Sequence, residues 1–289
     1  MKLKIKEKRY IRIGNQTSYI VKTPILPFEY AVANGFSAFE WFPDKKENGA
    51  GFETNEINNE TRHYIRDIAR AHDVTLSIHA PLCADPMKPK GQELLMKDLH
   101  FAYDLGATLF NIHLYPDEGI EVYMKAITKI TQKTAEMGIS LSIENTPYTI
   151  PEDFNQLFSL LRNLKGQKTE NVGMCLDLGH ANLCNSTHND FLSFMDRLDK
   201  KMPIIHVHLH ENYGDRDTHM PIFTGPSKKN DIGLKGFIKR LKERNFSGSI
   251  ILEQWPDPPL LLNQARDKLQ RLFEAEGFVF NQTIPNLSD

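Results

Sequence analysis

The sequence predicts a single-domain (β/α)8 TIM barrel of the α/β class. Short apolar runs rich in β-branched residues alternate with amphipathic helical patterns along the whole chain, which indicates a parallel sheet covered by helices. We count about eight strand–helix units, the number that closes such a sheet into a barrel. The 289 residues, 40% of them hydrophobic, suffice for one large core, and no linker-like change in composition divides them.

Charge and composition narrow the classes of function. The chain carries 35 basic and 37 acidic residues, so its net charge does not favour nucleic acid or anionic membranes, although a local basic groove could still bind them. No apolar run is long enough to span a bilayer. Residues 1–9 are basic without an apolar segment, so we expect a solvated arm and not a secretion signal. Three cysteines without Cys-x-x-Cys spacing indicate reduced thiols and a cytoplasmic location.

The expected strands are short apolar runs bounded by turn residues. They are Tyr10–Gly14, Ser37–Phe42, Thr75–His79, Thr108–His113, Ser140–Glu144, Val172–Asp177, Ile204–Leu209 and Ser249–Glu253. An open doubly wound sheet is the alternative to a barrel. It would usually carry a glycine-rich phosphate turn after the first strand, and residues 14–18 contain none.

The expected helices follow these strands in alternation and have apolar residues near helical spacing. Gly35, Gly106 and Gly138 are expected to end three of them, because glycine readily adopts the left-handed conformation at a helix terminus. The helices are Pro27–Asn34, Asn58–Ala71, Glu93–Leu105, Ile120–Met137, Pro151–Leu164, Asp190–Lys200, Leu234–Arg244 and Pro259–Ala275.

An ionisable residue lies at or near the carboxyl end of nearly every predicted strand. For any one of them, a capping or core role is the more ordinary explanation. In a barrel, however, these strand ends meet at one mouth, and so many charges would repel each other unless a cation or substrate compensated them. The residues are Glu40, His79, His113, Glu144, Asp177, His208 and Glu253.

Four of these residues form a predicted metal site. Glu144, Asp177, His208 and Glu253 come from successive strands, and three carboxylates with one imidazole suit Mn²⁺, Mg²⁺, Co²⁺ or a catalytic Zn²⁺. The interval between His208 and Glu253 is longer than those between the other neighbouring members of the set, because it contains the segment Glu211–Gly233. We expect this segment to be a functional loop.

Three histidines share one face of the strand Ile204–Leu209 and its continuation. His206, His208 and His210 alternate with apolar residues, so their side chains point to one side. We expect His208 to bind the metal and His206 to be its deeper partner or a core residue. For His210, a substrate contact and a simple exposed side chain are equally open.

Four segments together resemble the xylose isomerase-like barrel superfamily, which holds sugar (phosphate) isomerases and epimerases together with endonuclease IV. The resemblance covers nearly the whole chain. The segments are Ser142-Ile143-Glu144-Asn145, Val172-Gly173-Met174-Cys175-Leu176-Asp177-Leu178-Gly179-His180, His206-Val207-His208-Leu209-His210-Glu211-Asn212 and Ile250-Ile251-Leu252-Glu253.

The resemblance to the epimerases implies one divalent metal ion on Glu144, Asp177, His208 and Glu253. It also implies that Glu144 and Glu253 are the catalytic acid and base on opposite faces of a sugar or sugar phosphate. The reaction would be an isomerisation or epimerisation by proton transfer through a metal-bound enediolate. The residue matching His180 would contact a substrate oxygen; a helix-capping role is its alternative.

The resemblance to endonuclease IV implies an alternative, a phosphodiesterase with up to three zinc ions acting on abasic DNA. In that case five further residues would bind zinc; in an epimerase we expect them to contact substrate. They are His79, His113, His180, Asp217 and His219. Against the nuclease, residues 223–227 replace the usual Gly-x-Gly, Ala80–Asp85 looks more like the epimerases, and the net charge is near neutral.

Other candidates are weaker. Trp41, Phe42 and Trp255 could form an apolar wall against a sugar ring, although aromatic residues at a barrel rim more often serve packing. Arg216, or Lys228 with Lys229, could hold a phosphate, although a solvated charge is the more ordinary interpretation. A barrel that only binds a ligand is disfavoured by the paired carboxylates. A homo-oligomer would be compatible with this fold.

Overall fold

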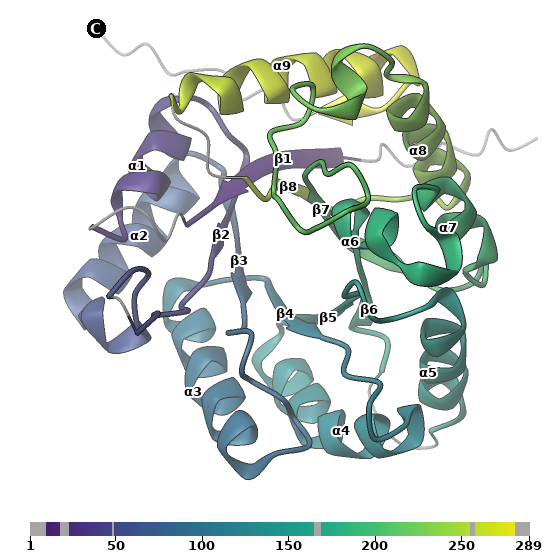
Figure 1. Ribbon diagram of the computed structural model, residues 1–289. Coiled ribbons are helices and arrows are strands. Elements are labelled where there is room, and N and C mark those ends of the chain that lie inside the picture. Colours follow the sequence, from purple (N-terminus) through teal and green to yellow (C-terminus); the bar gives the residue numbers. More distant parts are fainter. Residues whose placement is uncertain (1–9, 18–22, 48, 165–168, 255–257, 281–289) are drawn as a thin grey trace, which may run out of the picture.

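The computed structural model describes residues 10–17, 23–47, 49–164, 169–254 and 258–280. The expected arm at residues 1–9 and Trp255 lie outside these ranges. Eight parallel strands form a closed barrel with helices around it (Figure 1), which confirms the predicted (β/α)8 TIM barrel. The sheet follows the order β2-β3-β4-β5-β6-β7-β8-β1, and β1 pairs with β2 to close the ring.

The strands have nearly the predicted bounds. Strands β3, β5, β6 and β7 match the predicted ranges, and the others differ by one or two residues at their ends. The observed strands are β1 Tyr10–Gln16, β2 Ala38–Trp41, β3 Thr75–His79, β4 Leu109–His113, β5 Ser140–Glu144, β6 Val172–Asp177, β7 Ile204–Leu209 and β8 Ser249–Leu252. A short strand that the sequence did not predict, β9 (Val279–Phe280), pairs in parallel with β1.

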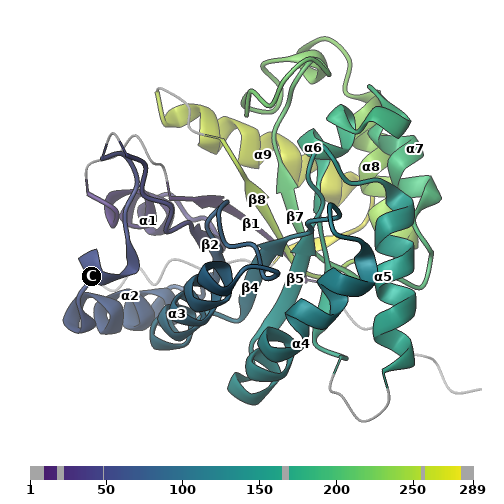
Figure 2. The same cartoon turned by 60° about the horizontal axis from the view of Figure 1, so that its bottom comes forward.

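The helices pack outside the strands (Figure 2). Gly106 and Gly138 follow α3 and α4 in the left-handed conformation, as predicted. Asn58 caps α2 by accepting the Thr61 N–H at 2.9 Å. The helices are α1 Leu26–Ala33, α2 Asn59–Ala71, α3 Pro89–Leu105, α4 Ile120–Met137, α5 Pro151–Asn163, α6 Leu178–Leu183, α7 Phe191–Arg197, α8 Ile232–Glu243 and α9 Leu260–Ala275. Within the described ranges, no helix is both long and apolar enough to cross a membrane.

The short helix α6 was not predicted, and it matters for the site. It begins directly after β6, with the Asp177 carboxylate accepting the backbone N–H of His180 at 2.6 Å. This cap places His180 in the first turn of a helix that starts at the barrel mouth.

The apolar core lies between the strands and the helices. Trp41 is fully buried there, and its ring contacts Phe28, Phe39, Phe52 and Phe101. An apolar wall at the mouth therefore does not include Trp41, because side chains alternate along β2 and those of Phe39 and Trp41 point outward. Phe42, the next residue, does reach the mouth region, where its ring centroid is 4.6 Å from that of His79.

The inside of the barrel is polar, whereas branched apolar residues usually fill this space. Glu40 and Asn111 are fully buried inward-facing side chains of β2 and β4. The Ser77 hydroxyl donates to Glu40 at 2.8 Å, and the Ser142 hydroxyl donates to Asn111 at 2.7 Å. The interior therefore supports the polar groups at the mouth from below.

Asp98 allows a test of the packing around α3. Its side chain is buried, and this burial raises the pKa of the Asp98 carboxyl to about 7. The folded protein therefore holds this proton more tightly than the unfolded chain. The protonated Asp98 carboxyl therefore stabilises the folded protein fully below about pH 4, and this stabilisation is lost as the pH rises to about 7. The loss in unfolding free energy is at most about 4 kcal/mol, since each pKa unit corresponds to about 1.4 kcal/mol.

We expect Asp98→Asn to remove this dependence. Between about pH 4 and pH 7 the wild type should lose unfolding free energy relative to the variant, which lacks the titrating carboxyl group. Above about pH 7 the difference between the two proteins should stay constant. Urea denaturation at several pH values measures it, with the exposed Asp67→Asn as control. A difference that does not vary with pH would contradict the burial effect.

Candidate metal centre

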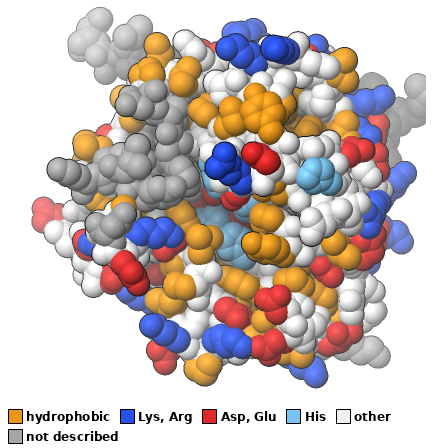
Figure 3. Space-filling model, in the orientation of Figure 1, with side chains coloured by type: hydrophobic (Ala, Val, Ile, Leu, Met, Phe, Trp, Pro, Cys, Tyr) orange, Lys and Arg blue, Asp and Glu red, His pale blue; other side chains and the backbone are white. Residues whose placement is uncertain are grey.

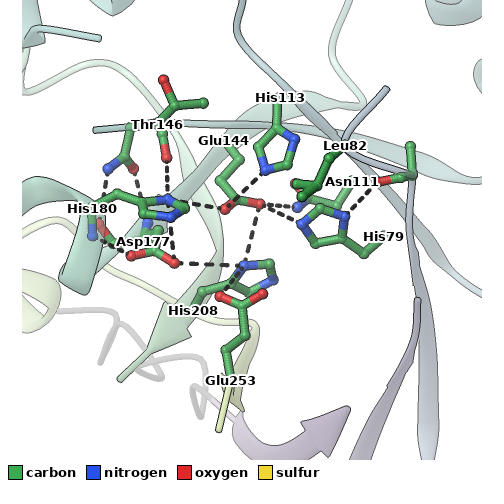
Figure 4. Close-up of polar contacts among 12 residues, drawn as sticks. His79, Leu82, Asn111, His113, Glu144, Thr146, Asp177, His180, His208 and Glu253 are labelled. Atoms are coloured by element: carbon green, nitrogen blue, oxygen red, sulfur yellow. Dashed lines mark hydrogen bonds and ion pairs between the residues drawn. The ribbon is translucent and has the colours of Figure 1, made fainter. Parts of the chain in front are cut away.

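The strand-end residues come together at the carboxyl end of the barrel. In the space-filling view a hollow at the centre of this face exposes histidine side chains (Figure 3). The close-up shows Glu144 between His79 and His113 on one side and His180 and Asp177 on the other (Figure 4). Glu40 lies deeper in the barrel, below this layer.

The acidic set, defined as Glu144, Asp177, His208 and Glu253, is compact and buried. One ligand atom from each member lies within 4.8 Å of the others, and the exposed fraction of each residue is 4% or less. His208 Nδ1 is 3.2 Å from Glu144 Oε2, 3.4 Å from Glu253 Oε2 and 3.9 Å from Asp177 Oδ2. The predicted ligands thus meet around one point.

These four residues also have atoms that need a partner. Among the described residues, no hydrogen bond reaches Glu144 Oε1, Asp177 Oδ2, His208 Nδ1 or Glu253 Oε2, although all four atoms are buried. Buried polar atoms without a hydrogen bond are costly, and a cation bound between them would remove that cost. The donor set therefore fits a divalent metal ion.

Two histidines form a second group with Glu144. His79 Nε2 is 3.1 Å from Glu144 Oε2, and His113 Nε2 is 3.5 Å from Glu144 Oε1. The Asn111 amide donates a hydrogen bond to Glu144 Oε2 from inside the barrel. Glu144 is therefore shared between the acidic set and this histidine pair.

The loop group, defined as His180, His210, Asp217 and His219, is a third cluster of possible metal ligands. Asp217 Oδ2 is 3.2 Å from both His180 Nε2 and His219 Nε2. The ring of His210 stacks on that of His219 at a centroid distance of 4.0 Å, and His210 Nε2 is 3.3 Å from Asp177 Oδ1. His210 thus lies between this group and the acidic set.

The loop after β7 holds this third group in place. Glu211 pairs with Met220 through two backbone hydrogen bonds, and its carboxylate accepts the backbone N–H groups of Gly225 and Ser227 at 2.9 Å each. His219 adopts a positive φ of 45°, which is uncommon for a residue other than glycine. The predicted functional loop is therefore a folded segment that brings Asp217 and His219 to the mouth.

Backbone carbonyl groups determine the tautomers of three of the histidines. In His79, His180 and His219 the Nδ1 atom lies within hydrogen-bond distance of a carbonyl oxygen, which can only accept, so Nδ1 carries the proton. Nε2 faces a carboxylate and offers a lone pair once it has lost its own proton. A carbonyl group that accepts the other ring N–H is typical of metal-binding histidines. The carbonyls belong to Ala80, Asn145 and Glu253, at 2.7, 2.8 and 2.8 Å.

The charges within the site stabilise one another. Burial opposes ionisation of Glu144 and Asp177, yet the neighbouring imidazoles hold the pKa of both carboxyl groups below its usual range. Burial also opposes protonation of His219, but the charges of Glu253 and Asp217 raise its pKa to about 9. Protons bound here would have to leave when a metal ion binds, so metal affinity should fall as the pH falls.

The structure separates the remaining candidates. His210 has an exposed fraction of only 2%, so a simple exposed side chain is the wrong interpretation for it. The signal that could have identified it as a possible ligand was its two-residue spacing from His208. Arg216 is not brought into the site, since its side chain is 81% exposed beside Asp215. His206 lies below the mouth as a deeper partner, where its Nε2 is 2.8 Å from Glu40 Oε2.

A cavity of about 320 Å³ opens beside the loop group. It is lined by His210, Asn182, Asn212 and Tyr213, among others. This volume lies in the range of sites for small organic ligands.

Comparison with known proteins establishes the family. The family model described as xylose isomerase-like TIM barrel matches residues 28–274. The chain belongs to this family. Two proteins of Methanocaldococcus jannaschii are also similar. One of them, the uncharacterized protein MJ1311, is 24% identical over 213 residues, which cover 66% of this chain and 68% of the relative.

Solved structures confirm the shared fold. A D-tagatose 3-epimerase-like protein superposes with a TM-score of 0.70 at 21% identity, covering 91% of this chain and 97% of the other. A D-psicose 3-epimerase crystallised in the presence of D-fructose gives a TM-score of 0.65 at 14% identity, covering 91% and 99%. At these identities the likeness shows the xylose isomerase-like barrel and not the activity.

Gly179 tests the position of His210. A Cβ atom on Gly179 would lie 2.0 Å from Cε1 of the His210 ring, which could not stay where it is. We expect Gly179→Ala to lower the unfolding free energy by about 1–3 kcal/mol, because overpacking costs more than the better helix propensity of alanine gains.

The matched control is Gly236→Ala in α8, where the added atom would meet the flexible ends of the Leu192 and Arg240 side chains. It should stay within about 1 kcal/mol of the wild type in urea denaturation. Equal stability of the two variants would show that His210 does not pack on Gly179.

Proposed function

We propose that the protein is a divalent-metal-dependent isomerase or epimerase acting on a small sugar or sugar phosphate by proton transfer. The observation that most directly supports this proposal is the position of two carboxylates beside one histidine nitrogen. Glu144 Oε2 is 3.2 Å and Glu253 Oε2 is 3.4 Å from His208 Nδ1. Glu144 ends strand β5 and Glu253 directly follows strand β8, so the two carboxylates would reach one metal ion from different parts of the barrel wall.

The acidic set would hold the ion. A bound divalent ion would supply a Lewis acid that polarises a carbonyl and the hydroxyl next to it. One of the two carboxylates, Glu144 or Glu253, would remove the proton from the carbon that bears this hydroxyl, and the other would return a proton on the opposite face. The imidazoles around Glu144, those of His79, His113 and His180, would bind the remaining substrate oxygens.

The loops around the mouth fit a small organic substrate. Leu82, Tyr148 and Tyr213 lie in loops that follow β3, β5 and β7 and have exposed fractions of 54%, 83% and 61%. Such apolar and aromatic side chains suit the faces of a sugar ring better than they suit a phosphate backbone. The family's barrel shared with sugar epimerases agrees with this assignment.

Isotope exchange tests the proposal. The protein loaded with Mn²⁺ and incubated with a panel of ketoses and sugar phosphates in heavy water should incorporate deuterium at the carbon beside the carbonyl, as measured by NMR. Glu144→Gln and Glu253→Gln should each slow this exchange at least about 100-fold, since each removes a proton-transfer group. Exposed Glu93→Gln is the control. Metal binding without exchange on any substrate would count against the proposal.

A second candidate is a multi-zinc phosphodiesterase for abasic DNA. It is supported by the two further donor groups, because His79 with His113 and Glu144, and the loop group, are each close enough together to hold a metal ion. His79, His113 and Glu144 could then hold one further ion, and the loop group could hold another; together with the ion of the acidic set they would supply the Lewis acid and an activated water for phosphodiester cleavage.

Metal analysis of the purified protein separates the two candidates. About one divalent ion per chain, with no nicking of an abasic duplex, is expected for the isomerase. About three zinc ions per chain together with nicking would establish the nuclease, and His113→Asn should then lower the count by about one. Elemental analysis by mass spectrometry gives the count, and a labelled duplex gives the nicking.

A further inference from the structure

A buried chain of polar contacts runs down the barrel interior from the acidic set. His208 Nε2 is 2.7 Å from Glu40 Oε1, and His206 Nε2 is 2.8 Å from Glu40 Oε2. The Ser77 hydroxyl donates to the same Oε2 atom at 2.8 Å. Glu40 therefore connects His208, at the mouth, to a second histidine and a serine in the layer below.

The position of Glu40 has an energetic cost that calls for an explanation. Its exposed fraction is 0%, and no lysine or arginine among the described residues forms an ion pair with it. A buried carboxylate is strongly unfavourable unless donors surround it. Glu40 Oε2 accepts a hydrogen bond from the Ser77 hydroxyl and lies 2.8 Å from His206 Nε2. Glu40 Oε1 has no aligned hydrogen-bond donor among the described residues, so it depends on the proton of His208 Nε2, which is 2.7 Å away.

A carboxylate accepts hydrogen bonds and cannot donate them. His208 Nε2 is 2.7 Å from Glu40 Oε1, and a ring nitrogen can lie this close to a carboxylate oxygen only if it carries a proton, although the two groups are not aligned as a regular hydrogen bond. A ring that binds a metal ion has one proton only, so the other nitrogen, Nδ1, then supplies the lone pair, and it is this atom that faces Glu144, Asp177 and Glu253. An amide in place of Glu40 would present both a donor and an acceptor and would remove this constraint.

His206 supports Glu40 from below. Its side chain is 1% exposed and lines a cavity of about 440 Å³ at the amino-terminal end of the barrel, together with the hydroxyl groups of Ser77 and Ser249. His206 Nδ1 has no hydrogen-bond partner in the described part of the chain, so water in this cavity can serve it while Nε2 remains with Glu40.

We propose that Glu40 is a positioning residue that keeps the proton of His208 on Nε2 and directs Nδ1 into the metal centre, with His206 and Ser77 holding Glu40 in place. The proposal rests on the metal centre under "Proposed function" but not on either reaction. It explains why Glu40, whose carboxylate does not reach the barrel mouth, is an acidic residue in the buried interior.

Glu40→Gln tests this role because it keeps the shape of the side chain and removes its charge. Zinc is the probe, with the dissociation constant measured by competition with a chromophoric chelator. We expect Glu40→Gln to weaken zinc binding by about 10- to 100-fold, the usual effect of losing a partner behind a metal-binding histidine. Glu93→Gln is the matched control. It makes the same change of carboxylate to amide at an exposed position of helix α3 and should change the constant by less than about threefold.

A spectroscopic readout separates positioning from a loss of folding. In the protein labelled with ¹⁵N histidine and loaded with ¹¹³Cd²⁺, the coupling to cadmium should appear on His208 Nδ1, with the proton on Nε2. The signals are assigned by their loss in His208→Asn. In Glu40→Gln the Nε2 proton resonance should move upfield or exchange faster.

The outcomes distinguish this proposal from the proposed function. Coupling of cadmium to His208 Nε2 in the wild type, or an unchanged zinc constant in Glu40→Gln, would overturn the role of Glu40 alone. Intact metal binding without isotope exchange or nicking would overturn the proposed reactions alone. Failure of the wild type to bind zinc or cadmium would overturn both.

Discussion

The buried carboxylate of Glu144 is the interaction on which the rest of the centre depends. It has no exposed surface, and imidazoles of His79, His113, His180 and His208 lie within 3.5 Å of its oxygens. A carboxylate in such a place needs positive charge around it, and the histidines supply that charge as protons or as ligands of a metal ion. The arrangement of the whole mouth follows from this requirement.

The fold separates apolar packing, which stabilises the protein, from the polar support of the site, and each occupies its own layer of the barrel. Apolar packing lies between strands and helices, where Trp41 and Phe101 belong to one aromatic cluster. The barrel interior is instead given to hydrogen-bonded residues such as Glu40, Asn111 and Ser142. Stability is thus carried by the outer layer, which leaves the inner layer free to support ionised groups at the mouth.

The two candidate activities use the same central carboxylates and differ in what surrounds them. A sugar would need space and hydrogen-bond partners at the mouth, whereas a bridged metal cluster would need the imidazole lone pairs as ligands. The carbonyl-bound tautomers of His79, His180 and His219 suit either use, because a lone pair can face a hydroxyl or a metal ion. The donor groups alone therefore leave both reactions open.

The sequence by itself determined the barrel and the members of the acidic set. Alternating apolar patterns define strands such as β5 and β6, and parallel strands must bring residues at their carboxyl ends, such as Glu144 and Asp177, to one mouth. Only the tertiary structure decided which way Trp41 points, that α6 begins on an Asp177 cap, and that His210 is buried. Each of these depends on strand register or on contacts between distant segments, and such contacts leave no periodic signal in the local sequence.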